Sequence, residues 1–294
     1  MWTMANRILA ITPGDPAGIG PEVVRAAIAG VRLPRGVSFE IVEGGTGRPG
    51  RPTDQSARAA FRALEVAVAG CLAGRYHALV TGPVSKERLA RVHFDYPGQT
   101  EFLAARCSLK ADAVTMAMSG RRLNVFLLTT HLSLARAIRQ ITAAKLARTL
   151  SHARDFLHRL KRAEPRIAIA ALNPHAGEGG LFGDEESTVL RPALRAAADK
   201  VGRWAQRMPI LPADTVFMKA AQGAFDGVVC LYHDQGLIPF KLIEFDRGVN
   251  VTLGLPFPRT SPDHGTAFDI AGSGKADPGS MMAAIRLAAR LAQK

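Results

Sequence analysis

Short apolar runs alternate along the chain with longer segments in which apolar residues recur at helical spacing. Residues 167–172 and 228–232 contain no charged side chain, which is typical of strands buried on both faces of a sheet. Residues 57–72 and 141–162 instead show the amphipathic period of a helix. Strands that alternate with helices in this way predict an α/β fold with a substantially parallel sheet.

The same patterns predict the remaining elements. Gly120-Arg121-Arg122 has the composition of a hairpin turn, and residues 259–272 are expected to form a polar loop. His152 and His158 lie among charged residues of the helix predicted at 141–162, so we expect them at the surface. The other predicted strands are residues 7–12, 37–42, 77–80, 114–118, 124–128 and 248–255, and the other predicted helices are residues 21–29, 97–106 and 185–201 and segments starting near 212 and 278.

Three of the predicted buried strands are followed by a histidine. His131 follows residues 124–128, His175 follows 167–172, and His233 comes directly after 228–232. Because the carboxyl ends of parallel strands meet along one edge of a sheet, the three imidazoles are candidate ligands of one divalent metal with open positions for substrate oxygens. A single histidine of this kind is more often an ordinary polar residue, and the shared placement of three favours ligation.

Two carboxylates accompany these histidines. Asp214 and Asp234 are candidate additional acidic groups of the site, and Asp214 has the alternative role of capping a helix.

Several glycine-rich and polar segments are candidates for anion binding. The loop at residues 13–22 opens a helix and either cradles an anion or forms only a tight turn; its glycine spacing is neither the dinucleotide fingerprint nor a P-loop. Lys86 follows a strand and is either an anion contact or solvated. The four glycines between 177 and 183 indicate unusual backbone angles or close approach to a ligand.

The polar residues that follow suit a charged, oxygen-rich substrate. Gln99 and Thr100 stand near a predicted helix N-terminus, where backbone N–H groups favour anions. Lys241, Asn250 and Arg259 follow His233 closely. A metal beside such cations fits oxidation of a secondary alcohol, but these residues leave metal-assisted phosphate hydrolysis open as well.

Composition narrows the classes of protein. The 294 residues suffice for two domains or one large α/β unit, and 47 % apolar with 21 % charged residues is ordinary for a globular enzyme. The net charge of +13 admits a non-catalytic nucleic-acid-binding protein, but the arginines are spread out and no groove-binding motif is visible, which favours an anionic small substrate. We expect no membrane partner. Three scattered cysteines, Cys71, Cys107 and Cys230, indicate a reducing compartment, the cytoplasm.

Seven motifs in order make the chain resemble one enzyme family. They occupy residues 11–22, 81–86, 172–180, 212–215, 232–236, 248–256 and 259–267. Through them the chain resembles the 4-hydroxythreonine-4-phosphate dehydrogenases of pyridoxal phosphate biosynthesis. The resemblance implies oxidation of 4-phosphooxy-L-threonine by NAD or NADP, followed by loss of CO2 to give 3-amino-2-oxopropyl phosphate.

The resemblance also assigns residues to roles. His131, His175 and His233 would hold one divalent metal (zinc, magnesium or cobalt), and Asp214 and Lys241 would be catalytic. Substrate contacts would be Gln99, Thr100, Lys241, Asn250 and Arg259. The loop at 264–272 looks like the NAD-binding loop of isocitrate and isopropylmalate dehydrogenases, with His264, Gly265, Thr266, Ala267 and Asp269 as cofactor contacts.

The fold implied by the resemblance is a two-domain α/β/α sandwich with mixed, largely parallel sheets and an active-site cleft between the domains. One domain would comprise residues 1–98 and 240–294, and the other residues 99–239, with a role in dimerisation. Members of the family look like homodimers with the active site near the subunit interface.

Two features depart from the family pattern. Gln99 stands where the family usually has histidine, and an amide cannot carry a proton or a positive charge. Residues 42–56 form a shorter segment than is typical. Relatives that act on other phosphorylated hydroxy acids, of the 4-phosphothreonate or erythronate type, or on cyclic dihydrodiols therefore stay as alternatives.

Overall fold

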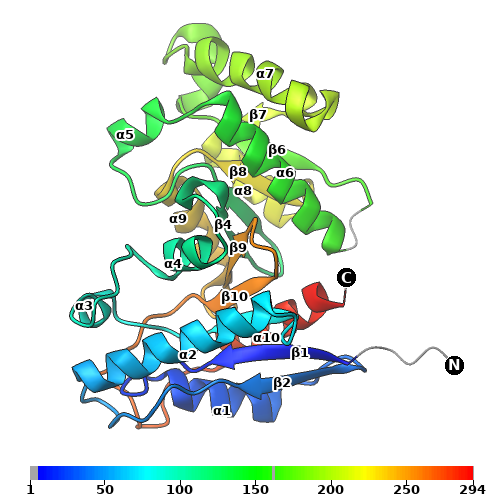
Figure 1. The fold of residues 1–294 in the computed structure, drawn as a ribbon. Helices are drawn as coiled ribbons and strands as arrows, with labels where there is room; N and C mark the ends of the chain where they lie inside the picture. The colour runs from blue at the N-terminus through cyan, green and yellow to red at the C-terminus, as the bar shows by residue number, and fades with distance from the viewer. Residues whose placement is uncertain (1–5, 161–162, 294) are drawn as a thin grey trace, which may run out of the picture. The chain divides into compact units, whose positions relative to one another are not determined.

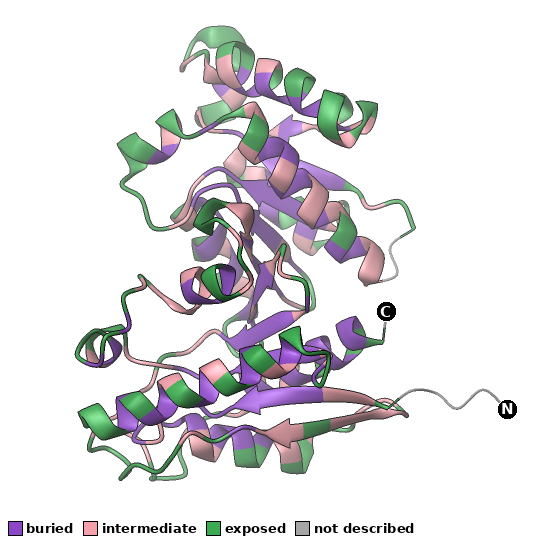
Figure 2. Ribbon diagram, viewed as in Figure 1, coloured by how far each residue is buried: buried purple, intermediate pink, exposed green. Residues whose placement is uncertain are grey.

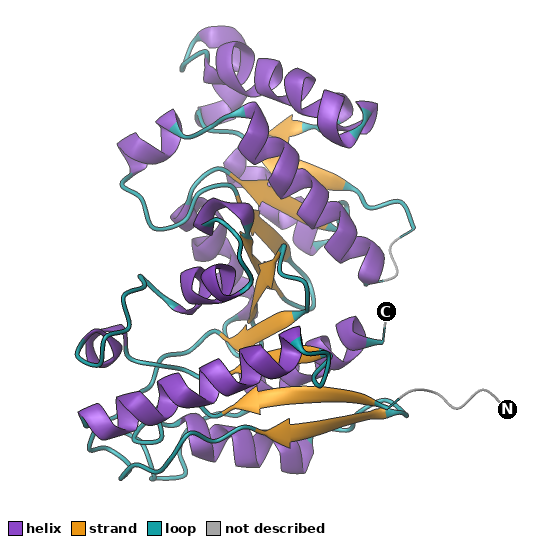
Figure 3. Ribbon diagram, viewed as in Figure 1, coloured by secondary structure: helices purple, strands orange, loops and turns teal. Residues whose placement is uncertain are grey.

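The computed structural model describes residues 6–160 and 163–293. Its contacts divide the chain into two units. Met1–Val114 and Asp246–Lys294 form the first unit, and Thr115–Phe245 the second. Residues 99–114 therefore belong to the first unit and residues 240–245 to the second. In each unit helices flank a sheet (Figures 1 and 3), and the mixed, largely parallel strand arrangement confirms the predicted fold class.

The sheet of the first unit has the strand order β2-β1-β3-β10-β9. Its pairs are parallel except for β9 and β10, which run antiparallel. The strands are β1 (Arg7–Thr12), β2 (Val37–Ile41), β3 (Ala78–Thr81), β9 (Val249–Leu253) and β10 (Arg259–Pro262). The prediction that a loop begins at residue 259 is wrong for its first four residues, which form the buried strand β10.

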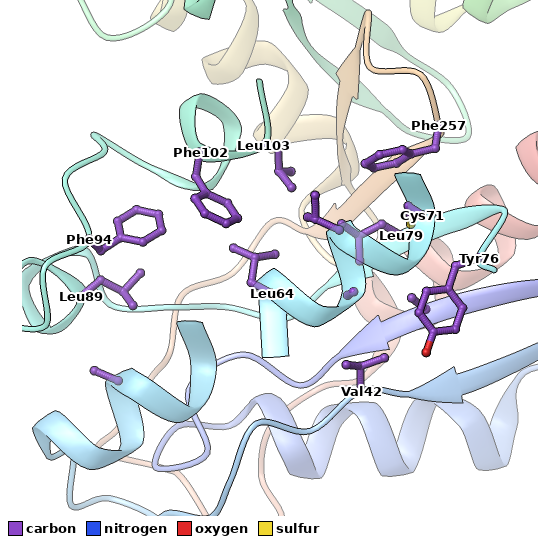
Figure 4. Packing of buried hydrophobic residues seen from close by; sticks show 14 of the residues in the cluster. Val42, Leu64, Cys71, Tyr76, Leu79, Leu89, Phe94, Phe102, Leu103 and Phe257 are labelled. Carbon is purple, nitrogen blue, oxygen red and sulfur yellow. The ribbon is translucent and has the colours of Figure 1, made fainter. Parts of the chain in front are cut away.

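The described residues of this unit form six helical segments. An apolar cluster fixes the start of one of them. They are α1 (Gly20–Gly30), α2 (Asp54–Leu72), α3 (Lys86–Ala90), α4 (Gln99–Arg106), a 3-10 turn (Ala111–Ala113) and α10 (Gly279–Ala292). Phe102 and Leu103 of α4 are fully buried against Leu64 of α2 and Leu79 of β3 (Figure 4). This packing holds the N-terminus of α4, and with it Gln99, at a fixed place in the unit.

The sheet of the second unit has the order β4-β5-β8-β6-β7. The hairpin predicted around Gly120 is confirmed, because β4 and β5 pair antiparallel, and the remaining pairs are parallel. The strands are β4 (Thr115–Ser119), β5 (Asn124–Leu127), β6 (Ile167–Ala170), β7 (Ile210–Leu211) and β8 (Gly227–Cys230). The central strands β5, β6 and β8 are almost wholly buried (Figure 2), as their apolar runs predict.

The helical segments of this unit are α5 (Leu134–Arg139), α6 (Ala143–Arg159), a 3-10 segment (Pro174–Gly180), a π-helical turn (Glu186–Leu190), α7 (Arg191–Val201), a 3-10 segment (Arg203–Arg207), α8 (Ala213–Ala221) and α9 (His233–Glu244). Residues 161–162 of the predicted helix 141–162 lie outside the described residues. The sequence analysis predicted neither the helices α5 and α9 nor the short strand β7 and the 3-10 segment Arg203–Arg207.

The surface position predicted for His152 is wrong. Its side chain is only partly exposed, and its Nδ1 lies 2.9 Å from the hydroxyl of the buried Thr115 on β4. Burial lowers the pKa of His152 below its usual value, with Arg148 adding to the shift and Asp155 opposing it. None of the helices in the described part of the chain is both long and apolar enough to cross a membrane.

Candidate functional site

The three histidines lie at the carboxyl ends of three neighbouring strands of the second unit. β8 pairs in parallel with β5 on one side and with β6 on the other. His131 follows β5, His233 follows β8, and His175 follows β6. The predicted placement along one sheet edge is thereby confirmed.

Two of these histidines are already in contact. The ring centroids of His131 and His233 lie 5.5 Å apart, whereas the His175 ring packs on Phe182 at 5.9 Å. Among residues 6–160 and 163–293, no three His, Cys, Asp or Glu side chains are gathered closely enough to hold an ion as they stand. The second unit thus brings together a pair of imidazoles and carries the third on a neighbouring loop.

The orientation of His233 suits metal ligation. Its Nδ1 lies 2.6 Å from the Asp234 carboxylate. A carboxylate only accepts hydrogen bonds, so Nδ1 is the donor of this bond, and Nε2 is the ring nitrogen left for another partner. Metal-ligating histidines usually have such a partner on the second nitrogen, and imidazoles suit zinc and cobalt. By donor chemistry, the residues present fit a divalent metal.

The loop that carries His175 has an unusual backbone. Five consecutive residues from His175 to Gly179 have positive φ angles, and three of them are not glycine. Such angles are costly for residues with a Cβ and persist only where surrounding contacts hold them. The unusual angles predicted from the four glycines are confirmed, but the sequence analysis did not identify the residue that holds the loop, the buried Glu186.

In the first unit, a buried arginine forms a second cluster of predicted residues. The Arg259 side chain donates from Nη1 to Thr252 Oγ1 at 3.1 Å, and from Nη2 to Thr81 Oγ1 at 2.6 Å and Gln99 Oε1 at 3.3 Å. Gln99 is itself oriented by donating from Nε2 to the Gly82 carbonyl at 3.1 Å. The sequence analysis did not name Thr81 and Thr252 as site residues, although they lie in the motifs at residues 81–86 and 248–256.

One hydrogen-bond donor of Arg259 has no partner. The residue is 3 % exposed, and its Nε is buried without a hydrogen-bond partner. Burial lowers its pKa to about 10, with Glu101 opposing the shift, so the guanidinium is cationic at neutral pH. Asn250 Oδ1 is also buried and without a partner. Buried polar atoms of this kind are rare and call for a ligand or water. The cationic guanidinium of Arg259 can donate to an anion, whereas Asn250 Oδ1 only accepts and calls for a donor group of a ligand or a water.

Thr100 stands beside this cluster in the first turn of α4. The N-cap residue of this helix, Gly98, has no side chain to cap it, so the backbone N–H groups of the first turn are not met by a capping side chain. The predicted location of Gln99 and Thr100 at a helix N-terminus is confirmed.

The predicted cofactor loop packs on the glycine loop that follows β1. Ile19 N donates to Thr266 O at 2.9 Å, and Gly272 N donates to Glu22 Oε2 at 3.0 Å. A Cβ on Gly18 would lie 2.7 Å from Thr266 O, so glycine is required there. His264 Nε2 and Glu22 Oε1 are buried without hydrogen-bond partners.

Residues 42–56, the segment expected to be shorter than in the family, also contact these two loops. Gly50 N donates to Ala17 O at 2.8 Å, and a Cβ on Gly272 would lie 2.8 Å from Pro49. Three segments that are distant in sequence therefore meet beside the predicted cofactor contacts. Gly265, Ala267 and Asp269 lie on the same loop, and Ala267 has a positive φ of 39°.

The remaining predicted residues lie on helices of the second unit. Asp214 is in the first turn of α8, and Lys241 is on α9, the helix that begins with His233. Asp214 does not cap α8 by a side-chain bond, because the N-cap position is Pro212.

Comparison with known proteins identifies the family. The family model of the pyridoxal phosphate biosynthetic protein PdxA matches residues 22–288. The chain belongs to the PdxA family. The resemblance inferred from the sequence is confirmed, and membership places the chain among the oxidoreductases of pyridoxal phosphate biosynthesis.

Two relatives named 4-hydroxythreonine-4-phosphate dehydrogenase match nearly end to end. The protein of Bradyrhizobium diazoefficiens is 49 % identical, with 99 % of each chain covered, and that of Geobacter metallireducens is 42 % identical, with 97 % of this chain and 95 % of the relative covered. Their alignments extend over 345 and 332 positions, more than the 294 residues of this chain, so the relatives have segments that this chain lacks.

Solved structures agree with the PdxA assignment. The 4-hydroxythreonine-4-phosphate dehydrogenase of Klebsiella pneumoniae superposes with a TM-score of 0.80 at 36 % identity, covering 97 % of this chain and 99 % of that one. A terephthalate 1,2-cis-dihydrodiol dehydrogenase of Burkholderia xenovorans gives 0.68 at 27 %, covering 97 % and 98 %. Isocitrate dehydrogenase of Methylococcus capsulatus, at 17 % identity, TM-score 0.54 and coverage of 94 % and 83 %, shares the fold.

Proposed function

We propose that this PdxA chain is a divalent-metal-dependent dehydrogenase that oxidises 4-phosphooxy-L-threonine with NAD or NADP and decarboxylates the product to 3-amino-2-oxopropyl phosphate. The observation that carries the proposal is the contact of His131 with His233 at the ends of adjacent parallel strands, with Asp234 leaving Nε2 of His233 to face a metal. His175 supplies the third ligand, and zinc, magnesium and cobalt are the candidate ions.

The residues of the first unit bind the substrate anion. The unfilled Nε of Arg259 and Oδ1 of Asn250 offer a donor and an acceptor in a buried setting, where charge-assisted hydrogen bonds are strong. Gln99 fixes the guanidinium, and Thr100 adds the open N-terminus of α4. Lys241 and Asp214 of the second unit transfer the proton of the substrate hydroxyl, and Lys241 also contacts the substrate.

A metal and a nucleotide would supply the remaining chemistry. Held by His131, His175 and His233, a metal would polarise the substrate oxygen and stabilise negative charge on it. A nicotinamide would take up the hydride, and the contacts proposed for the cofactor are His264, Gly265, Thr266, Ala267 and Asp269. The unpartnered His264 Nε2 and Glu22 Oε1 support a polar ligand at this loop.

A homodimer completes the proposal. α9 exposes an apolar stripe at helical spacing, with Ile238 65 %, Leu242 86 % and Phe245, the residue just after the helix, 74 % exposed. The partner is a second copy of this chain, since the same helix carries His233 and Lys241 and thereby puts the interface near the site. The free cysteines Cys71, Cys107 and Cys230 support a cytoplasmic location.

The direct test supplies 4-phosphooxy-L-threonine, NAD and Co2+, Zn2+ or Mg2+ and follows NADH absorbance together with CO2 release. NADH and CO2 in equal amounts are expected. Phosphate release without NADH would instead establish the hydrolase alternative. Absence of any reaction with folded, metal-loaded protein would overturn the assignment.

One alternative substrate class has its own support. The similarity to a terephthalate 1,2-cis-dihydrodiol dehydrogenase, together with Gln99 in place of the usual histidine, favours testing cyclic dihydrodiols and 4-phosphothreonate or 4-phosphoerythronate beside the main substrate. The highest kcat/KM in such a panel identifies the substrate class, because discrimination is a ratio of these values.

A further inference from the structure

A buried carboxylate holds the segment that leads into His175. Glu186, at the start of the π-helical turn, is 7 % exposed. Its Oε1 accepts hydrogen bonds from the backbone N–H groups of Leu172 at 2.7 Å and Asn173 at 2.9 Å. Its Oε2 accepts from Asn173 Nδ2 at 3.0 Å. One side chain thereby satisfies three donors just after β6.

These bonds continue into the turn that contains His175. The carbonyl of Asn173 accepts a hydrogen bond from Ala176 N at 3.1 Å, which closes a turn around Pro174 and His175. A Cβ on Gly177 would lie 2.6 Å from Gly183 O, so glycine is required there, and 3.2 Å from Glu186 Oε2, which puts the carboxylate beside this residue. Glu186 is therefore bonded to the chain before His175 and lies close to the chain after it.

The strained backbone at His175 needs a stabilising contact, and Glu186 can provide it. His175 has a φ of 51° and Ala176 one of 56°, angles that the chain does not keep without external support. The donors that hold Glu186 are the backbone N–H groups of Leu172 and Asn173, two and three residues after β6, and the side chain of Asn173, so the carboxylate ties the start of the loop to the rigid sheet. We infer that Glu186 is the positioning residue of His175, setting the direction in which this imidazole faces a metal.

The inference rests on the proposed role of His175 as a metal ligand. A double-mutant cycle distinguishes a failure of that role from a failure of the positioning role of Glu186. The probe is Co2+ alone, bound to the full chain, with affinity measured by calorimetry and coordination by the visible absorption of the ion. Glu186→Ala is expected to weaken Co2+ binding by about 10- to 100-fold, the usual cost of losing an outer-sphere partner. In a His175→Ala background the same change should have no further effect.

Conservative variants distinguish a loss of Co2+ binding caused by misfolding from one caused by the lost hydrogen bonds of Glu186. Glu186→Gln keeps an oxygen for the two backbone donors but sets an amide against Asn173 Nδ2, so an intermediate loss is expected. Asn173 also donates to Glu185 Oε2 at 2.5 Å. The combination Asn173→Asp, Glu185→Gln and Glu186→Gln reverses every donor and acceptor of this side-chain cluster and should restore binding. Glu178→Gln, an exposed change on the same turn, is the matched control and should bind as the unaltered chain does.

The outcomes are distinct. If His175→Ala leaves Co2+ affinity unchanged, the metal proposal for His175 fails. If His175→Ala weakens binding but folded Glu186→Ala and Glu186→Gln do not, or if the Glu186→Ala loss is as large in the His175→Ala background, the positioning role fails.

Discussion

Gln99 stands where the family resemblance leads us to expect a histidine, and its contacts explain how an amide fits there. Its Nε2 is engaged by the Gly82 carbonyl, so Oε1 faces the guanidinium of Arg259. A neutral acceptor orients the arginine without adding charge. The anion site consequently has no titrating group at position 99, although Arg259, Lys86 and Glu101 lie on the elements around it.

Gln99→His should introduce a pH dependence. Next to the Arg259 cation, a histidine would have its pKa held below the ordinary value of about 6.5, because like charges disfavour ionisation. As pH falls through that pKa, the new positive charge strengthens substrate binding by roughly tenfold. The measurement is the ratio of variant to unaltered KM across pH, in which substrate ionisation cancels. A flat ratio would show that residue 99 does not face the anion.

Arg259→Met should separate stability from function. The arginine is buried, and the hydrogen-bond acceptors it contacts are uncharged oxygens, so folding carries the cost of its desolvation. We expect the unfolding free energy of the ligand-free chain to stay the same or rise by up to about 2 kcal/mol, while kcat/KM falls at least about 100-fold. Urea denaturation and steady-state kinetics check this, with the exposed Arg25→Met as control. A clear loss of stability would mean that the arginine is structural.

At the scale of elements, the packing of α6 on β4 contains a titrating contact. His152 has a lowered pKa because it is buried, so it is neutral in the folded chain. The unfolded chain takes up a proton near pH 6.5, the ordinary value for histidine, before the folded chain does. Stability from this contact is full above that pH and is lost as pH falls toward the folded pKa.

His152→Gln should therefore flatten the acid side of the stability profile. The urea midpoint of the unaltered chain is expected to fall as pH drops below about 6.5, and that of the variant to fall less. His158→Gln, on the same helix, is the matched control and should keep the original slope. Equal slopes for the unaltered chain and His152→Gln would contradict the assignment.

The exposed stripe of α9 makes a prediction about assembly. Leu242→Asp places a charge in the centre of the stripe and should weaken self-association by at least about tenfold in Kd, because an apolar interface core does not tolerate an unpaired charge. Sedimentation equilibrium measures the effect. Leu72→Asp, at the half-exposed end of α2, should leave the association unchanged. Equal association constants for both variants would show that α9 is not part of the interface.

The fold was predictable where one pattern of side chains was enough. The apolar runs at β5, β6 and β8 correctly predict buried parallel strands, and the glycines after His175 correctly predict positive φ angles. β10 was missed because its residues Arg259, Thr260 and Ser261 are polar although they are buried, and the side chains of Arg259 and Thr260 form hydrogen bonds there. A search for apolar runs does not detect such a strand. Glu186 was missed because its partners follow a strand 13 or more residues earlier, and only the folded loop brings them together.

At the scale of the whole molecule, the residues proposed for the metal and those proposed for the nucleotide lie in different units. The three histidines lie in the second unit, whereas the cofactor loop, with its contacts to Ile19 and Glu22, lies in the first. Each group is held by the hydrogen bonds and packing of its own unit. Metal binding and nucleotide binding should therefore be separable by mutation.

The test compares two variants by ligand binding alone. Replacing His131, His175 and His233 together by alanine should abolish Co2+ binding but leave NADH affinity, measured by nucleotide fluorescence, within about twofold, since sites without shared partners behave independently. His264→Ala should do the reverse, weakening NADH by roughly tenfold through loss of a buried hydrogen-bonding group. If the triple variant lost NADH affinity as strongly as His264→Ala, the nucleotide would depend on the histidines, and the division of ligands between the two units would be wrong.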